Sequence, residues 1–317
     1  MSTTPTVELD AQYRQLREEC GLLARSSRGE LLVSGPDAAE YLQGQLTNDV
    51  EALEPGDGQY ATLLDRKGHI QADMRVLRPA AEEILLDTEA EGLEAARRHL
   101  QMYKIGRDVE VADITAVRSI LSLIGPRSAE IAGTPPLPEH ANEPVSVAGV
   151  KCMAAGTASG IDLIVDASGA DGLREALKAA GAVEVSPEAV EIVRIEAGVP
   201  RFGAEMGAAT MPAEAGIVET TVSFTKGCYI GQETVARLHY KGKPNRNLRG
   251  LRLSSPADAG MPLWLGEKDV GSLGSACVSP HLGPIGLAIV RREAEPGNTL
   301  AVGEDGVTAE VVDLPFG

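Results

Sequence analysis

The chain has 317 residues, of which 43% are hydrophobic and 24% charged; this is typical of soluble globular proteins and leaves room for two or three domains. Its net charge of −17 argues against a general nucleic-acid surface, because phosphate affinity comes mainly from lysine and arginine. No apolar run approaches the roughly 20 residues of a membrane span, and the polar N-terminus does not resemble a signal peptide. We therefore expect a cytoplasmic protein.

The first third of the sequence predicts alternating helices and strands. A helix is expected over 10–28, with Tyr13, Leu16 and Cys20 on one stripe. Further along, periodicity and turn residues predict a strand at 30–34, a helix starting at Gly35-Pro-Asp, a hairpin of strands 59–64 and 69–77, a strand at 83–88 and a helix over 89–103.

This pattern then recurs later in the chain. Two pairs of matching segments occur in the same order. Chance is a poorer explanation for two such matches than for one. The pairs are Gly35-Pro-Asp-Ala-Ala-Glu with Gly125-Pro-Arg-Ser-Ala-Glu after the strand 117–124, and Leu85-Leu-Asp…Gly92-Leu with Ile164-Val-Asp…Gly172-Leu. We predict a divergent repeat of one α+β unit, near 30–105 and 117–197, with a turn-rich insertion at 133–144.

The next helix ends on an unusual carboxylate. Ser186-Pro187 predicts its start and Gly198 its end. Glu196 then lies in the last turn, facing the negative end of the helix dipole. Two explanations remain open: Glu196 pairs with Arg194 or Arg201, or it binds a hydrogen-bond donor of a ligand.

Beyond residue 244 the sequence predicts only short strands separated by Gly, Pro and Asp turns. This pattern is typical of a small antiparallel barrel or sandwich. The boundary near 240–247 gives predicted domains 1–243 and 244–317. The expected strands are 248–253, 270–278, 286–291, 299–302 and 307–312.

The segment Lys226-Gly-Cys-Tyr-Ile-Gly-Gln-Glu233 places a thiol between two glycines and close to a lysine. Cys228 is either a reactive thiolate or a buried cysteine in a glycine-bounded turn. The other cysteines, at positions 20, 152 and 277, form no CxxC motif, and a disulfide framework is not expected in so large a cytosolic chain.

Residues 226–249 form a basic stretch in an acidic protein. They hold six lysines and arginines against one glutamate, a net charge of +5. The stretch is either a solvated linker or an anion site for polyglutamate, phosphate or an acidic partner.

Several motifs together resemble the YgfZ family, the folate-binding branch of the superfamily that contains the glycine-cleavage T protein. The N-terminal motifs, shared with the aminomethyltransferases, are Gly35-Pro-Asp-Ala and Gly68-His-Ile-Gln-Ala-Asp73. The later motifs are Arg194-x-Glu196-x-Gly198-x-Pro200-Arg201-x-Gly203, Pro212-x-Glu214-Ala215-Gly216 and, most specifically, Lys226–Glu233.

The resemblance implies an α+β fold of three lobes: two related α+β units around a folate hole and a C-terminal antiparallel β-barrel. It implies that Glu196 binds the pterin, whose paired N–H groups suit a carboxylate, and that Asp73 lies near the one-carbon unit. Asp73 and Cys228 are the candidate catalytic residues, and no metal ligands are expected. The candidate ligand-binding residues are Glu196, Asp73, Arg194, Tyr60, Lys226 and Arg237.

The resemblance also implies a function: a tetrahydrofolate-binding accessory protein that supports assembly or repair of iron–sulfur clusters and their enzymes, including tRNA-modifying ones. The ligand would be tetrahydrofolate or a one-carbon derivative, and the partners iron–sulfur enzymes or cluster-assembly proteins, with no nucleic acid and no membrane. Cys228 alone could not hold a cluster, since clusters normally take about four thiolates.

The alternative is a folate-dependent aminomethyl- or methyltransferase of the glycine-cleavage T-protein type, which Asp73 keeps open. A third possibility is an interaction module without folate.

Overall fold

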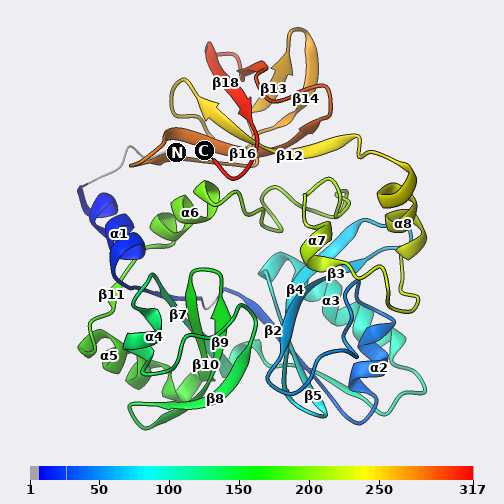
Figure 1. Cartoon of the computed structure of the whole chain (residues 1–317), viewed down its shortest axis with the longest axis vertical. Coiled ribbons are helices and arrows are strands. Elements are labelled where there is room, and N and C mark those ends of the chain that lie inside the picture. Colours follow the sequence, from blue (N-terminus) through cyan, green and yellow to red (C-terminus); the bar gives the residue numbers. More distant parts are fainter. Residues whose placement is uncertain (1–6, 26, 317) are drawn as a thin grey trace. The chain divides into compact units, whose positions relative to one another are not determined.

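The computed structural model describes residues 7–25 and 27–316, which divide into two compact units (Figure 1). We call Arg14–Val185 with Glu219–Glu233 the repeat unit. The barrel unit consists of 7–13, Ser186–Val218 and 234–316. Within the described residues, no helix has the length and apolar character needed to cross a membrane.

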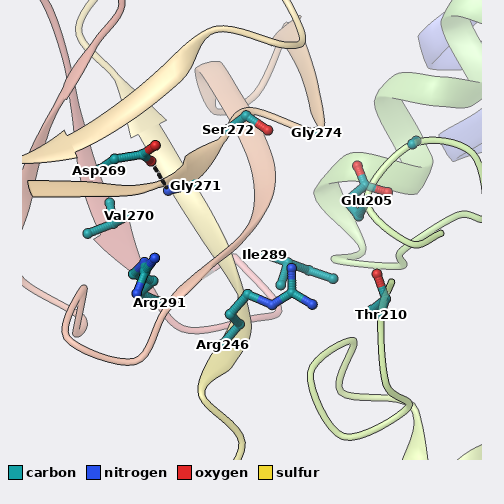
Figure 2. A pocket seen from close by; sticks show the side chains of 11 residues that line it. Glu205, Thr210, Arg246, Asp269, Val270, Gly271, Ser272, Gly274, Ile289 and Arg291 are labelled. Carbon is teal, nitrogen blue, oxygen red and sulfur yellow. Dashed lines mark hydrogen bonds between the residues drawn. The ribbon is translucent and has the colours of Figure 1, made fainter. Parts of the chain in front are cut away.

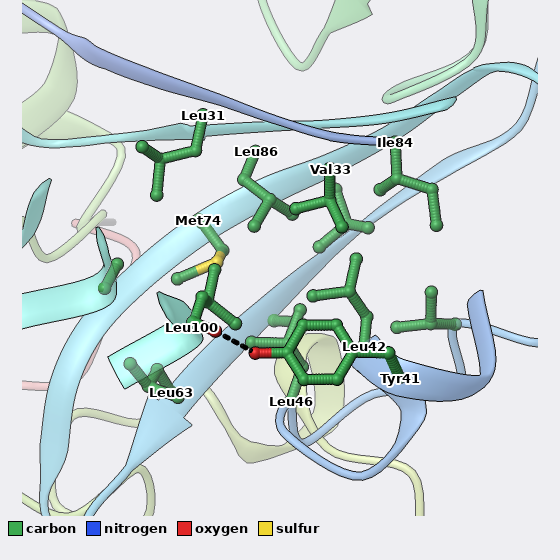
Figure 3. Close-up of a cluster of buried hydrophobic side chains, with 14 of the residues drawn as sticks. Leu31, Val33, Tyr41, Leu42, Leu46, Leu63, Met74, Ile84, Leu86 and Leu100 are labelled. Carbon is green, nitrogen blue, oxygen red and sulfur yellow. Dashed lines mark hydrogen bonds between the residues drawn. The ribbon is translucent and has the colours of Figure 1, made fainter. Parts of the chain in front are cut away.

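The first half of the repeat unit is a five-stranded antiparallel sheet with strand order β3-β4-β5-β2-β6, covered by α3. Its core is a cluster of buried aliphatic side chains into which Tyr41 projects, donating a 2.5 Å hydrogen bond to the Leu100 carbonyl (Figure 3). The elements are β2 (Gly29–Ser34), α2 (Ala38–Gln43), β3 (Gly58–Leu64), β4 (Ile70–Ala80), β5 (Glu83–Thr88), α3 (Ala90–Tyr103) and β6 (Glu110–Asp113).

The second half is a six-stranded sheet with strand order β11-β1-β7-β10-β9-β8. Here β1 (Gly21–Ala24) lies between β7 and β11, antiparallel to the first and parallel to the second. The other elements are η1 (Thr115–Val117), β7 (Arg118–Ile124), α4 (Ser128–Ala132), β8 (Asn142–Val147), β9 (Val150–Thr157), β10 (Gly160–Asp166), η2 (Ala167–Gly169), α5 (Ala170–Ala179) and β11 (Val183–Glu184).

The two halves share one order of elements, a strand and a helix followed by three strands, a helix and a last strand. The two related α+β units expected from the sequence are thus confirmed. Gly35 and Gly125 occupy matching turns with φ of 122° and 129°. A Cβ atom would lie 2.3 Å from the Asp108 carbonyl oxygen at Gly35 and 2.5 Å from that of Glu19 at Gly125. Only glycine fits either turn, which explains why the motif survives in both repeats.

The two sheets of the repeat unit meet through a small apolar cluster that includes Leu77 and Ile164. Beside it, buried Arg75 of β4 forms ion pairs with Asp87 of the same sheet at 2.5 Å and with Asp162 of the other sheet at 2.7 Å. A buried charge of this kind is tolerated only when it is paired, so these contacts fix how the two repeats dock.

The barrel unit contains a seven-stranded antiparallel sheet, order β14-β13-β17-β18-β12-β16-β15, which curls into a half-barrel. In the described residues its edge strands are not paired with each other. The strands are β12 (Arg246–Leu253), β13 (Pro262–Leu265), β14 (Lys268–Ser272), β15 (Ser275–Ser279), β16 (Gly283–Arg291), β17 (Thr299–Val302) and β18 (Val307–Val312).

Helix α6 (Pro187–Glu196) packs on β15 and β16 within this unit. It begins and ends as predicted: Ser186 Oγ accepts the Ala189 N–H at 3.3 Å, and Gly198 follows the helix with φ of 70°. The remaining helices are α1 (Val7–Glu18), α7 (Val218–Thr221) and α8 (Gln232–Lys241).

Two predicted elements were wrong. The helix expected over 10–28 ends at Glu18, because the following residues gain more by pairing as β1 with two strands than by continuing a helix. The strand expected at 270–278 is interrupted at Leu273–Gly274, where β14 ends and β15 begins. The elements without a predicted counterpart include β1, β6, β11, β13, α7 and α8.

Candidate functional site

Asp73 and Tyr60 are brought together by the β3–β4 hairpin. Asp73 is buried, and its Oδ2 accepts a hydrogen bond from the Tyr60 hydroxyl. Its Oδ1 is also buried and has no hydrogen-bond partner among the described residues. Burial raises the pKa of Asp73, partly offset by the Tyr60 hydrogen bond, and burial likewise holds the pKa of Tyr60 well above its usual value. The pair therefore offers a ligand one desolvated acceptor atom, held in place by a phenol.

The sequence analysis missed two charged residues, Arg28 and Glu89, that act electrostatically on both Asp73 and Tyr60. Arg28 donates to Asp87 at 2.5 Å and also to Glu89. Burial by itself raises the pKa of Asp87, but the charges of Arg28 and Arg75 outweigh this effect and hold that pKa below its usual range. One sign of this charged group is present in the sequence: Asp87 is a carboxylate at the end of the apolar run Ile84-Leu-Leu.

Glu196, on α6 of the barrel unit, is 5% exposed. Both of its oxygens lie 3.1 Å from the Tyr13 hydroxyl, and Oε1 also accepts the Ser279 hydroxyl. Ser279 Oγ in turn accepts the backbone N–H groups of His281 and Leu282 at 3.0 and 2.8 Å. Hydroxyl donors thus help to hold this carboxylate at the unfavourable end of its helix.

Arg194 has other partners. Its guanidinium donates to Glu191 at 2.6 Å, to Ser275 at 2.7 Å and to Glu205 at 3.1 Å, and also to the Val199 carbonyl. This accounts for most of its donor capacity within the barrel unit. A folate-binding role for Arg194 stays a prediction without support from its contacts.

Lys226 is also engaged within the protein. Its ammonium donates to the carbonyl oxygens of Gln43, Leu46 and Asn48 at 2.6, 2.7 and 2.9 Å, which uses all three of its N–H bonds. Burial lowers the pKa of Lys226 to about 8. The lysine therefore fastens the cysteine motif to the loop after α2, all within the repeat unit.

The other two candidate residues are accessible. Cys228 is exposed in the segment before α8, and Arg237 is exposed on α8. Cys228 is a free thiol. Within the described part of the chain, no group of three or more His, Cys, Asp or Glu side chains is placed to hold a metal ion.

A cavity of about 330 Å³ lies in the barrel unit (Figure 2). It includes none of the predicted site residues. Its Arg246 is held by Glu214 and by the Ala209 carbonyl, and its Asp269 accepts the Gly271 N–H at 2.9 Å. Because these charges already have partners in the protein, we do not place the site here.

Comparison with known proteins identifies the family. Residues 6–226 match the family described as GCVT N-terminal domain, and residues 246–316 match the glycine cleavage T-protein C-terminal barrel domain. The chain belongs to the glycine cleavage T-protein family.

Similar curated members of the T-protein family are named aminomethyltransferases. That of Rubrobacter xylanophilus is 30% identical, covering 97% of this chain and 86% of its own length. That of Streptomyces coelicolor is 31% identical, with 96% and 88% covered. The structure of the glycine cleavage system aminomethyltransferase T from Bartonella henselae superimposes with a TM-score of 0.88 at 24% identity, covering 98% of this chain and 89% of that one. This match confirms the T-protein fold.

These comparisons correct the functional expectation. The accessory role in iron–sulfur cluster assembly or repair, with its iron–sulfur partners and tRNA-modifying clients, is wrong, since curated relatives that match nearly the whole chain are named aminomethyltransferases. The eight-residue motif Lys226–Glu233 is outweighed by family matches over residues 6–226 and 246–316. Tetrahydrofolate, expected from the resemblance, is a substrate or cofactor of the T-protein family.

Proposed function

We propose that this protein is a folate-dependent aminomethyltransferase of the T-protein type. The reaction transfers the carbon of an aminomethyl group, donor–CH2–NH2, to tetrahydrofolate. The products are methylene-tetrahydrofolate, ammonia and the donor with hydrogen in place of the aminomethyl group. Family membership supports the reaction class, and the Asp73–Tyr60 pair supports it chemically.

The observation that carries the proposal is the buried, unpartnered Oδ1 of Asp73. Positive charge develops on the carbon and nitrogen of an aminomethyl group as its bond to the donor breaks. A carboxylate in a desolvated setting stabilises such charge more strongly than one in water, and it accepts an N–H bond in a fixed direction. Tyr60 keeps the other oxygen occupied, so that only Oδ1 faces the reacting group.

We propose that Glu196 holds the pterin of tetrahydrofolate. Its support is a buried carboxylate at a helix C-terminus, where the dipole disfavours it, together with Tyr13 and Ser279, which hold it in one orientation. Paired N–H donors of a pterin suit such a carboxylate.

We also propose that the chain lies in the YgfZ branch of the family. The support is the motif Lys226–Glu233 alone, with its exposed Cys228. The branch assignment adds no further activity to the proposal.

The test is formation of methylene-tetrahydrofolate from an aminomethyl-loaded carrier of a glycine cleavage system, by wild type and by Asp73→Asn. The asparagine keeps the size of the side chain but removes its charge, and we expect kcat to fall by about 100-fold or more. Asp171→Asn, an exposed change on α5, is the matched control and should keep wild-type activity. Equal activity in wild type and Asp73→Asn would refute the role of Asp73.

A further inference from the structure

His140 has an unusual backbone for a residue with a side chain. It lies in the irregular segment between α4 and β8, with φ of 67° in the left-handed region. Residues other than glycine rarely adopt this conformation, although histidine tolerates it better than most. Such strain persists only where the surroundings impose it, and it often accompanies function.

Contacts from both repeats hold this turn in place. The His140 N–H donates to Gly156 of β9 at 2.9 Å, and the Asn142 side chain donates to the Asp57 carbonyl at 2.7 Å. A Cβ atom on Gly58 would lie 2.4 Å from the His140 carbonyl oxygen, and one on Gly156 would lie 2.1 Å from that of Pro138. The turn thus packs directly against one glycine of each repeat, Gly58 and Gly156, and this close packing fixes its conformation.

This turn presents its imidazole to the proposed site. The ring stacks on Tyr60, with centroids 6.2 Å apart and planes 9° from parallel. Its Nδ1 is buried without a partner among the described residues. Burial lowers the pKa of His140, against the opposing effect of Glu139, and Arg75 and Asp87 also act on it electrostatically. The ring therefore meets Tyr60 as a neutral, flat surface at neutral pH.

Ordinary packing is the competing explanation, but it does not account for the choice of residue. Glycine or asparagine would suit the left-handed backbone with less strain, and neither carries a ring. The ring contacts the tyrosine whose hydroxyl binds Asp73. The insertion at 133–144, otherwise without a role, thereby reaches from the second repeat to a pair built on the first.

We propose that His140 is a positioning residue for the Asp73–Tyr60 pair. By stacking on the phenol ring, it keeps the Tyr60 hydroxyl on Asp73 Oδ2, so that Oδ1 stays aimed at the aminomethyl group. This inference rests on the proposed transfer reaction for its catalytic consequence but not for its structural content.

The experiment uses His140→Asn, which suits the left-handed backbone and removes the ring, with His140→Gly as a second such variant. The matched control is His99→Asn in the same unit. His99 is half-buried, its Nε2 is hydrogen-bonded to Gln45 Oε1 at 2.9 Å, and its ring centroid lies 4.5 Å from that of Tyr103. Misplacing a catalytic group by about 1 Å can cost 100-fold, so we expect kcat to fall at least about tenfold in both His140 variants. KM for tetrahydrofolate should stay within about twofold.

A double-mutant cycle separates positioning from packing. If His140 acts through the Tyr60 hydroxyl, His140→Asn should cost nothing further in a Tyr60→Phe background. If the kcat losses of the two single variants multiply in the double variant, the proposal is overturned. A kcat within twofold of wild type in His140→Asn would also overturn it.

A second readout does not depend on activity. With tyrosine labelled at Cζ, the Tyr60 resonance, identified by its loss in Tyr60→Phe, should shift in His140→Asn and stay in place in His99→Asn. An unmoved Tyr60 resonance in His140→Asn would overturn the proposal, whatever the activity. If wild type transfers no one-carbon unit, the proposed function fails, and the resonance still decides whether His140 positions Tyr60.

Discussion

Lys226 offers a sharp test of whether the cysteine motif binds ligand or holds the fold. The sequence placed Lys226 among the folate-binding candidates, whereas the structure directs its ammonium to three carbonyl oxygens, one at the end of α2 and two in the loop that follows it. Lys226→Met keeps most of the side-chain volume and removes the three donors. We therefore expect the change to lower stability and to leave tetrahydrofolate affinity unaltered.

The magnitude follows from two opposing contributions. Three hydrogen bonds to a charged donor stabilise by about 1.5–3 kcal/mol each, together about 4.5–9 kcal/mol. Burying the ammonium, which lowers its pKa from 10.5 to about 8, costs about 3 kcal/mol. The net loss on removing Lys226 is then on the order of 3 kcal/mol, or about 6–12 °C in melting temperature for a unit of this size.

Urea unfolding followed by circular dichroism measures this loss, with calorimetric titration of tetrahydrofolate on the same preparations. Lys243→Met is the matched control, since Lys243 is exposed in the same basic stretch. It should shift stability by less than about 0.5 kcal/mol. If Lys226→Met unfolds like wild type but binds tetrahydrofolate at least tenfold more weakly, the lysine is a ligand-binding residue and our reasoning is refuted.

Three further predictions concern single carboxyl or thiol groups. Burial raises the pKa of Glu30 from 4.5 to about 7, so the stability that Glu30 contributes below pH 4.5 is lost as the pH rises through 7. Glu30→Gln should remove this pH dependence and raise the free energy of unfolding by up to about 3 kcal/mol at pH 8. A difference in melting temperature that does not change with pH would contradict this prediction. Burial raises the thiol pKa of Cys20 to about 11, that of Cys277 to about 12, and also that of Cys152. Iodoacetamide should therefore label the exposed Cys228 first at pH 8. Earlier labelling of any other cysteine would refute this prediction. Glu196→Gln should weaken tetrahydrofolate binding at least about tenfold by calorimetric titration, and unchanged affinity would exclude the pterin role.

The features predicted correctly from the sequence are those whose cause is local. The cap of α6 depends on Ser186 and its immediate neighbours, and the repeated turns at Gly35 and Gly125 depend on φ values that glycine permits. The β3–β4 hairpin follows from alternating residues around a turn. These signals were sufficient for the α+β class and its internal repeat.

The features that were missed depend on partners far away in the sequence. Glu196 is held by Tyr13, 183 residues away, and by Ser279, 83 residues away. The partners of Lys226 are backbone carbonyls, which no side-chain pattern reveals. Strand β1 exists because β7 and β11 are there to pair with it. Periodicity along the chain carries no information on such contacts.

The motif around Cys228 misleads for a different reason. A short motif of reactive residue types suggested a thiol function, but the motif's lysine is a structural contact of the repeat unit. The buried pair of Asp73 and Tyr60 supports the chemistry better, and its evidence is an unpartnered oxygen visible only in the fold.

The measurement that tests the central claim most directly is single-turnover transfer by the wild-type protein. An aminomethyl-loaded carrier is mixed with excess enzyme and tetrahydrofolate, and methylene-tetrahydrofolate and ammonia are followed together. We predict that one ammonia is released for each methylene group transferred, at a rate at least about 100-fold above the reaction without enzyme. A protein that binds tetrahydrofolate but leaves the aminomethyl group on its carrier would contradict the account.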